Sequence, residues 1–329
     1  MWDIFQNSKS HSINTQRIQF DKVIEMSFHH YIDLEVISPR NLDELLELLT
    51  KLDSDAIIIA GGTDVNVLLR KGRVRAKTLI DISRIKELKF IKYENSFIRI
   101  GALTTLSEII ENTYVKEYLP LLHEALLNVG SWQIRNLATI GGNIGRASPT
   151  GDVLLTLYAL DAKIKLLSKY GERIVNIEDL VTGPGKLNIN KYEVIAEILI
   201  QPMLKNDIYY HKKLSFRKVH AVASVSIAMV LRQDLNGPCN KFVKARMVLG
   251  AVAPTPIRIH EVEEILCREL LDYNGIERIS NLIVSKIKPR SGIRGSAKFR
   301  KLATMGLVKE GLKTILDKSC NSIKTTKLN

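Results

Sequence analysis

Two pairs of adjacent glycines constrain this chain more than any other feature of its sequence. Gly61-Gly62 directly follows the apolar run 57–59, and Gly141-Gly142 follows the run 135–140, which we interpret as β-rich. Without Cβ atoms, the backbone at such pairs can adopt positive φ angles and bring its amides close to a ligand. Thr63 and Asn143 add short polar side chains beside the pairs. Because successive amides form a concave anion site, the two segments predict a pair of loops that close on one dinucleotide.

The length of the chain sets the number of domains. With 329 residues, 45% of them hydrophobic, it has material for two or three packed domains. No apolar run approaches the length of a membrane span, so no membrane partner is expected. The N-terminus lacks a basic segment followed by an apolar stretch, which argues against a secretory signal. We therefore expect a cytoplasmic protein.

The net charge of +13 raises the question of a nucleic-acid partner. Basic residues are densest over 286–301, but glycine and proline interrupt them and no aromatic series is interleaved. This pattern favours a solvated basic face or a surface for an acidic partner protein, so no nucleic acid is expected. Cys239, Cys267 and Cys320 are widely spaced and odd in number, which predicts ordinary reduced cysteines.

The hydrophobic patterning divides the chain into four parts. Residues 1–25 lack a sustained period and predict a poorly ordered N-terminal extension, followed by lobes over 26–84 and 85–204 and a C-terminal domain over 205–329. In the first lobe, leucines at helical spacing follow Asn41, which with Glu44 predicts a capping box. Strands are expected at 33–37, 56–59, 78–82, 97–100, 163–167 and 173–177, and helices at 42–49, 65–69, 106–111, 119–128 and 153–160.

The C-terminal part has a different pattern. The polar segment 205–212 predicts a domain boundary, and apolar residues then alternate over 223–231 and 243–251 around the turn Asn236-Gly237. Helical patterns follow at 262–270, 276–287 and 298–316. The expected architecture is therefore an antiparallel sheet backed by helices, and the fold class of the whole chain is α+β.

At this point the glycine segments resemble a known family. Residues 58–64 and 138–144, together with Ala147-Ser148-Pro149 and Asp152, resemble the two FAD-binding loops of the flavin subunits of molybdenum hydroxylases. That family includes the flavin subunits of bacterial xanthine dehydrogenase and carbon monoxide dehydrogenase. The resemblance runs from about residue 31 to 316 and includes Gly183-Pro184-Gly185-Lys186, which we expect to form a turn-rich loop near the mouth of the site.

The resemblance implies a two-lobed FAD-binding fold of the p-cresol methylhydroxylase type, followed by a C-terminal α+β domain. Amides around the two glycine pairs would hold the diphosphate of FAD, with hydrogen bonds added by neighbouring polar side chains. The cofactor-binding residues that it implies are Ile58, Ile59, Ala60, Gly61, Gly62, Thr63, Asp64, Val65, Ala138, Thr139, Ile140, Gly141, Gly142, Asn143, Ser148, Asp152, Ala196 and Lys213.

Three of these positions carry separate expectations. Asp152 would hold a hydroxyl-bearing part of the cofactor, and it can also act as an N-cap of the following helix. Ala196, with Val129, falls where the family flanks the isoalloxazine ring. Lys213 falls where the family has a lysine close to the flavin, whose charge stabilises a reduced flavin. The alternative for Lys213 is a surface lysine at the start of a strand.

The resemblance implies an FAD-binding electron-transfer subunit of a multisubunit, xanthine dehydrogenase-like molybdenum hydroxylase. The molybdenum cofactor would lie on a large partner subunit and [2Fe–2S] clusters on a small one, with NAD or another acceptor receiving the electrons. No catalytic side chain is required, because the flavin carries the chemistry, and no cluster with metal-ligand spacing is present. A Gly-x-Gly-x-x-Gly fingerprint is also missing, which argues against a Rossmann site. Two alternatives stay open: a stand-alone FAD oxidoreductase of similar fold, and a basic binding module without redox activity.

Overall fold

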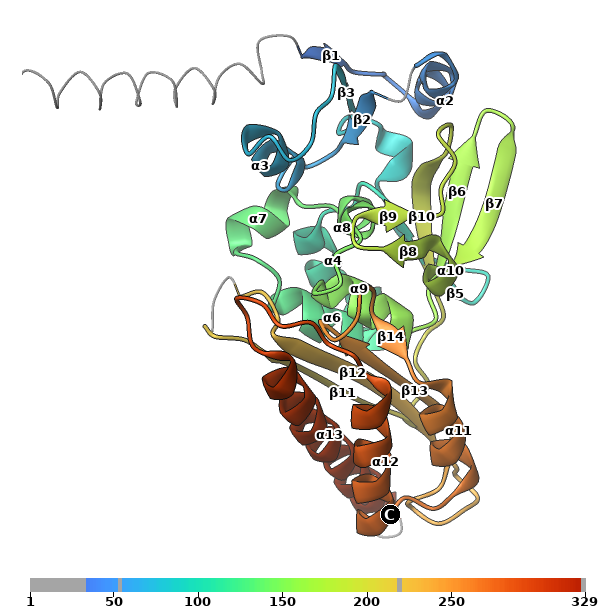
Figure 1. Ribbon diagram of the computed structural model, residues 1–329. Coiled ribbons are helices and arrows are strands. Elements are labelled where there is room, and N and C mark those ends of the chain that lie inside the picture. The colour runs from blue at the N-terminus through green and yellow to red at the C-terminus, as the bar shows by residue number, and fades with distance from the viewer. Residues whose placement is uncertain (1–33, 53–54, 218–220, 327–329) are drawn as a thin grey trace, which may run out of the picture.

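The computed structural model describes residues 34–52, 55–217 and 221–326, and the expected extension over 1–25 lies outside these ranges. Figure 1 shows three parts arranged one below the other, in chain order from the first lobe to the C-terminal domain. Each part has its own sheet. Helices and sheets are mixed throughout, which confirms the α+β class.

The first lobe is built on a three-stranded parallel sheet of order β1-β3-β2. Leucines on one face of α2, Leu45 and Leu49, pack into the core beside it. The Asn41 side chain accepts from the amide of Glu44 as expected, but the Glu44 carboxylate accepts from the amide of Arg40. The elements are β1 (Glu35–Ile37), α2 (Leu42–Lys51), β2 (Ala56–Ile59), α3 (Val65–Arg70), β3 (Thr78–Asp81) and the short 3₁₀ turn η1 (Lys86–Leu88).

The second lobe is built on a five-stranded antiparallel sheet of order β4-β5-β10-β6-β7. The chain leaves this sheet after β5, forms a group of short helices, and returns to it at β6. The elements are β4 (Ile91–Glu94), β5 (Phe97–Gly101), α4 (Leu106–Glu111), α5 (Thr113–Tyr118), α6 (Pro120–Leu127), α7 (Trp132–Leu137), α8 (Ile140–Arg146), α9 (Asp152–Ala159), β6 (Lys163–Ser168), β7 (Gly171–Asn176), α10 (Ile177–Leu180), β8 (Val181–Gly183), β9 (Lys186–Leu187) and β10 (Val194–Ile200).

The second glycine pair is not the loop after a β-rich run that its sequence suggests. The preceding residues form helix α7, and Gly141-Gly142 lies in the first turn of helix α8. Two N-caps override the apolar pattern: the side chain of Ser131 accepts from the amide of Ile134, and Thr139 accepts from that of Gly142. Such caps satisfy amides that a helix start leaves without partners.

The C-terminal domain contains a four-stranded antiparallel sheet of order β11-β12-β13-β14. Helices α11, α12 and α13 cover one face of it, and α9 of the second lobe packs on the other (Figure 1). Burial from both sides explains why almost every residue of β12 is buried. The elements are β11 (Asp207–Leu214), β12 (Val225–Gln233), β13 (Phe242–Gly250), β14 (Ile257–Arg258), α11 (His260–Arg268), α12 (Tyr273–Lys286) and α13 (Ala297–Thr326).

The polar segment 205–212 is a strand rather than a connecting segment. From Asp207 onward it forms β11, with Tyr210 in the core under the helices and Tyr209 packed against the core of the second lobe. The strand can hold the charge of Asp207 because this carboxylate accepts hydrogen bonds from two nitrogens of Arg232 on the neighbouring strand. The position of the domain division at 204/205 stays a prediction.

A network of charges joins the second lobe to the C-terminal domain. Asp161, in the turn after α9, pairs with Lys244, Arg246 and Arg258 of β13 and β14. The Arg246 side chain is 8% exposed and also donates to the carbonyl of Ala159. One carboxylate of the lobe therefore holds three cations of the neighbouring sheet.

The prediction of reduced cysteines is wrong for two of the three. Cys239, in the connection between β12 and β13, forms a disulfide with Cys320 near the end of α13, and Cys267 is free. The partners lie 81 positions apart in sequence. Helix α13 extends well beyond the expected end at residue 316, and this extension brings Cys320 to the hairpin.

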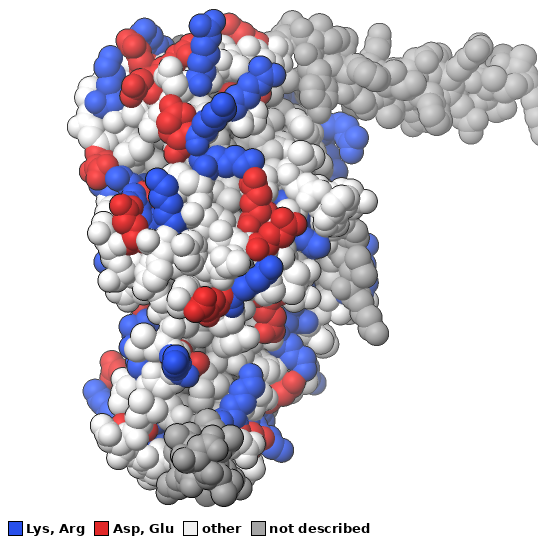
Figure 2. Space-filling view, turned by 180° about the vertical axis from the view of Figure 1, so that it is seen from behind, with Lys and Arg blue, Asp and Glu red and all other residues white. Residues whose placement is uncertain are grey.

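The face of the molecule seen in Figure 2 is not dominated by one sign of charge. On the face seen in Figure 2, lysine and arginine side chains alternate with carboxylates instead of forming a continuous basic patch. Some cations of the basic segment 286–301 are engaged: Lys286 pairs with Glu261, and Arg300 donates to the carbonyls of Ser224 and Ala251. Among the helices of the described ranges, none combines the length and apolarity needed to traverse a bilayer.

Candidate cofactor-binding cleft

The two glycine segments meet in space. A Cβ on Gly61 would collide with the carbonyl of Leu137, so the first segment packs directly against the main chain that leads into α8. Gly62 next to it has φ +66°, a conformation that favours glycine. The predicted convergence of the two segments is therefore confirmed, and it is made by backbone atoms at their base.

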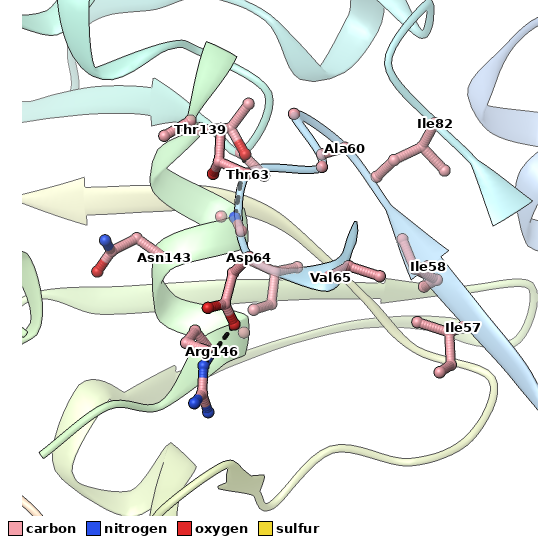
Figure 3. A pocket seen from close by; sticks show the side chains of 18 of the residues that line it. Ile57, Ile58, Ala60, Thr63, Asp64, Val65, Ile82, Thr139, Asn143 and Arg146 are labelled. Atoms are coloured by element: carbon pink, nitrogen blue, oxygen red, sulfur yellow. Dashed lines mark hydrogen bonds and ion pairs between the residues drawn. The ribbon is translucent and has the colours of Figure 1, made fainter. Parts of the chain in front are cut away.

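A cleft of about 780 Å³ lies between the segments, within the range of ordinary small-molecule sites. Figure 3 shows side chains of both segments around it, with Thr63 and Asp64 from the first segment, Thr139 at the start of helix α8 and Asn143 on that helix. The predicted site residues that line this cleft are Ile58, Ala60, Gly61, Gly62, Thr63, Asp64, Val65, Ala138, Thr139, Gly141, Gly142 and Asn143. Gly185 also lines it, which confirms the expected place of the loop 183–186.

The two segments differ in the amides that they offer. Around α8 the amides are occupied: Gly141 donates to the carbonyl of Ala102 at 2.9 Å, and Gly142 to the hydroxyl of Thr139 at 3.1 Å. By contrast, none of the described residues accepts from the amides of 61–64. Free main-chain donors are therefore concentrated on the first segment. The part expected of the amides of Gly141 and Gly142 in holding a diphosphate stays a prediction.

The packing of α8 requires a glycine at position 141, whatever its role in binding a ligand. A Cβ there would lie 2.7 Å from the Cβ of Ala102 and 2.8 Å from its carbonyl oxygen. Both separations are shorter than ordinary van der Waals contacts, so α8 sits against the end of β5 only because this position is glycine. A large residue at Gly141 would disturb the fold before it reached any ligand.

Four charged side chains line the cleft. Arg146, the last residue of α8, has its Nε 2.5 Å from the Oδ2 of Asp64, and this ion pair spans the two segments (Figure 3). Glu193 accepts from Arg173 at 2.6 and 2.8 Å, and this hydrogen bonding lowers the pKa of Glu193 to about 2. Arg73, in the turn after α3, is exposed. With Glu193 neutralised by its own arginine, the cleft carries a surplus of positive charge.

Asp152 and Lys213 form a buried pair outside the cleft lining. Lys213 Nζ lies 2.6 Å from Asp152 Oδ2 and also donates to the carbonyl of Asn128 at 2.8 Å. Both side chains are less than a tenth exposed, so Lys213 is not the surface lysine of the alternative interpretation. The helix α9 that Asp152 opens has Gly151 as its N-cap, without a side-chain cap, so the capping role is wrong. Burial raises the pKa of the Asp152 carboxyl, and the charge of Lys213 opposes that rise.

The remaining predicted site residues lie around the cleft rather than on its walls. Ile59 belongs to β2, Ile140 is fully buried in α8, and Ala196 is buried in β10 beside the lining residue Ile195. The Ser148 hydroxyl lies 3.1 Å from that of Thr150. Their contacts with a cofactor stay predictions.

Several lining residues were missed by sequence reasoning, and two of them lie on helix α8. Gly145 and Arg146 follow the second glycine pair on the same helix and face the cleft. A helical interpretation of 140–146 would have found them, since residues three and four apart share a helix face. Within the described ranges, no group of three or more histidine, cysteine or acidic side chains is arranged to hold a metal ion.

Comparisons with known proteins agree on one family. Residues 28–202 match the model of the FAD binding domain in molybdopterin dehydrogenase, and residues 210–315 match that of the CO dehydrogenase flavoprotein C-terminal domain. The xanthine dehydrogenase FAD-binding subunit of Escherichia coli O157:H7 is 33% identical over 74% of this chain and 83% of its own. The glyceraldehyde dehydrogenase medium chain of Sulfolobus acidocaldarius is 31% identical over 84% of this chain and 98% of its own.

Solved structures show the same relationship. A chain of the carbon monoxide dehydrogenase of Hydrogenophaga pseudoflava superimposes with a TM-score of 0.82 at 28% identity, over 87% of this chain and 98% of that one. The fold and the cleft thus define a two-lobed flavoprotein with a C-terminal α+β domain. The chain belongs to the family of FAD-binding flavoprotein subunits of the molybdenum hydroxylases, which are oxidoreductases. The family expected from the sequence is confirmed.

Proposed function

We propose that this chain is the electron-transfer subunit of a multisubunit molybdenum hydroxylase. It takes electrons from [2Fe–2S] clusters of a small partner subunit and passes them through FAD to NAD or another acceptor. The molybdenum cofactor lies on a large partner subunit. The observation that carries the proposal is the cleft in which both glycine segments meet, with free amides and cations on its walls.

The donor groups of the cleft fit FAD. A diphosphate needs positive charge and donors that approach without bulky side chains, and the open amides of 61–64 with Thr63 and Asn143 provide them. Apolar side chains such as Ile58 and Ile195 offer surface for flat rings. Asp152 Oδ1 is buried without a hydrogen-bond partner in the chain. A buried carboxylate oxygen of this kind is costly unless something donates to it, which supports the hydroxyl-binding role proposed for Asp152.

The chemistry divides between the cofactor and the chain. FAD, when bound, supplies the redox chemistry of the subunit. The chain binds and orients it, and we assign to Lys213 the task of placing a cation near the reduced cofactor. The Asp152 carboxylate, 2.6 Å from Lys213 Nζ, fixes the lysine in position. No general acid or base of this chain is needed.

The partner subunits are inferred from the relatives. Carbon monoxide dehydrogenase of Hydrogenophaga pseudoflava contains a protein named its medium chain, 29% identical over 84% of this chain. Two other relatives are likewise an FAD-binding subunit and a medium chain. A chain of this kind, with a cofactor cleft but no metal-ligand cluster in its described residues, is suited to work between other redox subunits.

The test is a spectrum followed by a purification. The purified protein, reconstituted with FAD, is expected to show flavin absorbance bands, and acid extraction should release FAD. A protein that stays colourless after reconstitution would contradict the proposal and favour the basic binding module. Affinity purification of the tagged chain from its native cell should then yield two partner chains that contain molybdenum and iron. Substrate oxidation by the chain alone would favour the stand-alone oxidoreductase.

A further inference from the structure

We propose that Arg146 is a binding residue for the FAD diphosphate and that it exchanges its contact with Asp64 for the diphosphate when the cofactor binds; this rests on the function proposed above. The starting point is the imbalance between the two walls. The first segment offers the open amides of 61–64, whereas the amides of Gly141 and Gly142 on α8 are occupied within the chain. A diphosphate held from one side only would leave half of its charge facing a wall that offers the neutral side chain of Asn143 but no free amide of its glycine pair. The second wall therefore needs a cation.

Arg146 is the cation that this wall provides. It ends α8 and lines the cleft, and a Cβ on Gly185, across the mouth, would lie 3.6 Å from its Nη1. The absence of a side chain at Gly185 thus leaves room around the guanidinium. The contact with Asp64 is made through Nε, and no described residue accepts a hydrogen bond from Nη1 or Nη2. These two nitrogens form the fork that binds phosphate oxygens in pairs.

The contact with Asp64 is close but poorly directed. Arg146 Nε and Asp64 Oδ2 are 2.5 Å apart, yet this buried oxygen has no partner with hydrogen-bond geometry. Asp64 also stands at the N-cap position of α3 without capping it, so its carboxylate is not used in that way either. A charge held by a misaligned partner can be transferred to a better acceptor at small cost. The diphosphate is such an acceptor.

The remaining charges do not compete for Arg146. Glu193 is held by two hydrogen bonds from Arg173. Arg73 lies on an exposed turn of the first lobe. The pair Arg146 and Asp64 is therefore the charged contact of the cleft that joins its two walls (Figure 3).

The experiment measures FAD binding to the apo full chain by fluorescence titration, at low and at high salt. We expect R146Q to raise the FAD dissociation constant roughly 10- to 100-fold and to flatten its dependence on salt, because a charge-assisted pair is lost. R146K should recover part of the affinity, since it restores the charge without the fork. R84Q is the matched control: Arg84 is an exposed arginine of the first lobe, outside the cleft, with no described partner.

The substitution Asp64→Asn tests whether Arg146 binds the cofactor or only joins the two walls of the cleft through its pair with Asp64. Asp64→Asn removes the carboxylate that holds Arg146 and keeps the main-chain amide of residue 64, so D64N is expected to bind FAD more tightly than the wild-type chain. An equal loss of affinity in D64N and R146Q would show that the pair only holds the two walls together, and would overturn the proposal. The proposal would also be overturned if the R146Q and R84Q variants bound FAD with the same dissociation constant. Failure of the wild-type chain to bind FAD would instead refute the function proposed above.

Discussion

Gly145 offers a sharp test of the cleft, because the fold itself does not need a glycine there. It lies inside α8, and a Cβ built on it would meet no atom within 4 Å. Its φ is not positive, unlike that of Gly62. A glycine inside a helix costs about 1 kcal/mol relative to alanine. Since the chain gains nothing from this cost, we infer that the missing side chain leaves space for a ligand that lies against the helix.

The perturbation is a pair of substitutions at this position. Gly145→Ala is expected to raise the free energy of unfolding of the apo protein by about 0.5–1 kcal/mol, because it removes the glycine penalty without a clash. Gly145→Phe should leave the apo protein folded and project a ring into the cleft of about 780 Å³. Overpacking of this kind costs about 1–3 kcal/mol, which corresponds to a roughly 5- to 150-fold weaker FAD affinity.

The assay is a fluorescence titration with FAD, accompanied by thermal unfolding of the apo protein. Gly306→Phe is the matched control, since Gly306 lies in α13, and a Cβ there also meets nothing within 4 Å, but it is remote from the cleft. It should bind FAD like the wild-type chain. Unchanged FAD affinity in a folded Gly145→Phe protein would refute the reasoning, since the cofactor would then not lie against α8.

Three further predictions concern the stability of the C-terminal domain and of its contact with the second lobe. Reduction of the Cys239–Cys320 disulfide, or Cys320→Ser, should lower the free energy of unfolding by about 4.5 kcal/mol, the loop-closure entropy for a separation of 81 residues. Chemical denaturation with and without reductant measures this, and equal midpoints would contradict it. Burial lowers the pKa of His211 to about 4 in the folded chain, below its value of about 6.5 in the unfolded chain. Between these two values the unfolded chain binds more protons than the folded one, so the free energy of unfolding should fall as the pH is lowered from about 6.5 to 4. His211→Gln should flatten that part of the stability curve; an unchanged slope would exclude His211 as its source. Asp161→Asn should lower the free energy of unfolding by about 3 kcal/mol, because it leaves the buried Arg246 side chain without its carboxylate. A shift of the denaturation midpoint smaller than that of an exposed surface substitution would show that Asp161 does not stabilise Arg246.

The sequence predicts the family and the meeting of the two glycine segments, and it does so because glycine pairs with short polar neighbours have few other uses. It misleads on the second pair, where an apolar pattern indicates a β-rich run and local caps at Ser131 and Thr139 start two helices instead. Capping energies depend on which side chain finally meets which amide, so a pattern of hydrophobic residues does not contain them.

The sequence patterns also did not predict contacts between residues that lie far apart in the chain. Asp152 meets Lys213 at a separation of 61 positions, and Cys239 meets Cys320 at 81. In both cases the second residue lies in an element whose extent was misjudged: β11 was interpreted as a polar connection, and α13 continues beyond its expected end. Arg146 was missed for a related reason, because its place on the cleft wall follows only once 140–146 is a helix.

The contact between Gly61 and Leu137 has a consequence for how the site is loaded. Because main-chain atoms touch at the floor of the groove, the separation of its walls there is set by peptide geometry and does not depend on any rotamer. The cleft is therefore preorganised, and little conformational entropy of the protein is lost when a ligand binds. In the electron-transfer role proposed above, a preset frame would also fix where FAD sits relative to a docked partner subunit, a constancy that such a role needs from one turnover to the next.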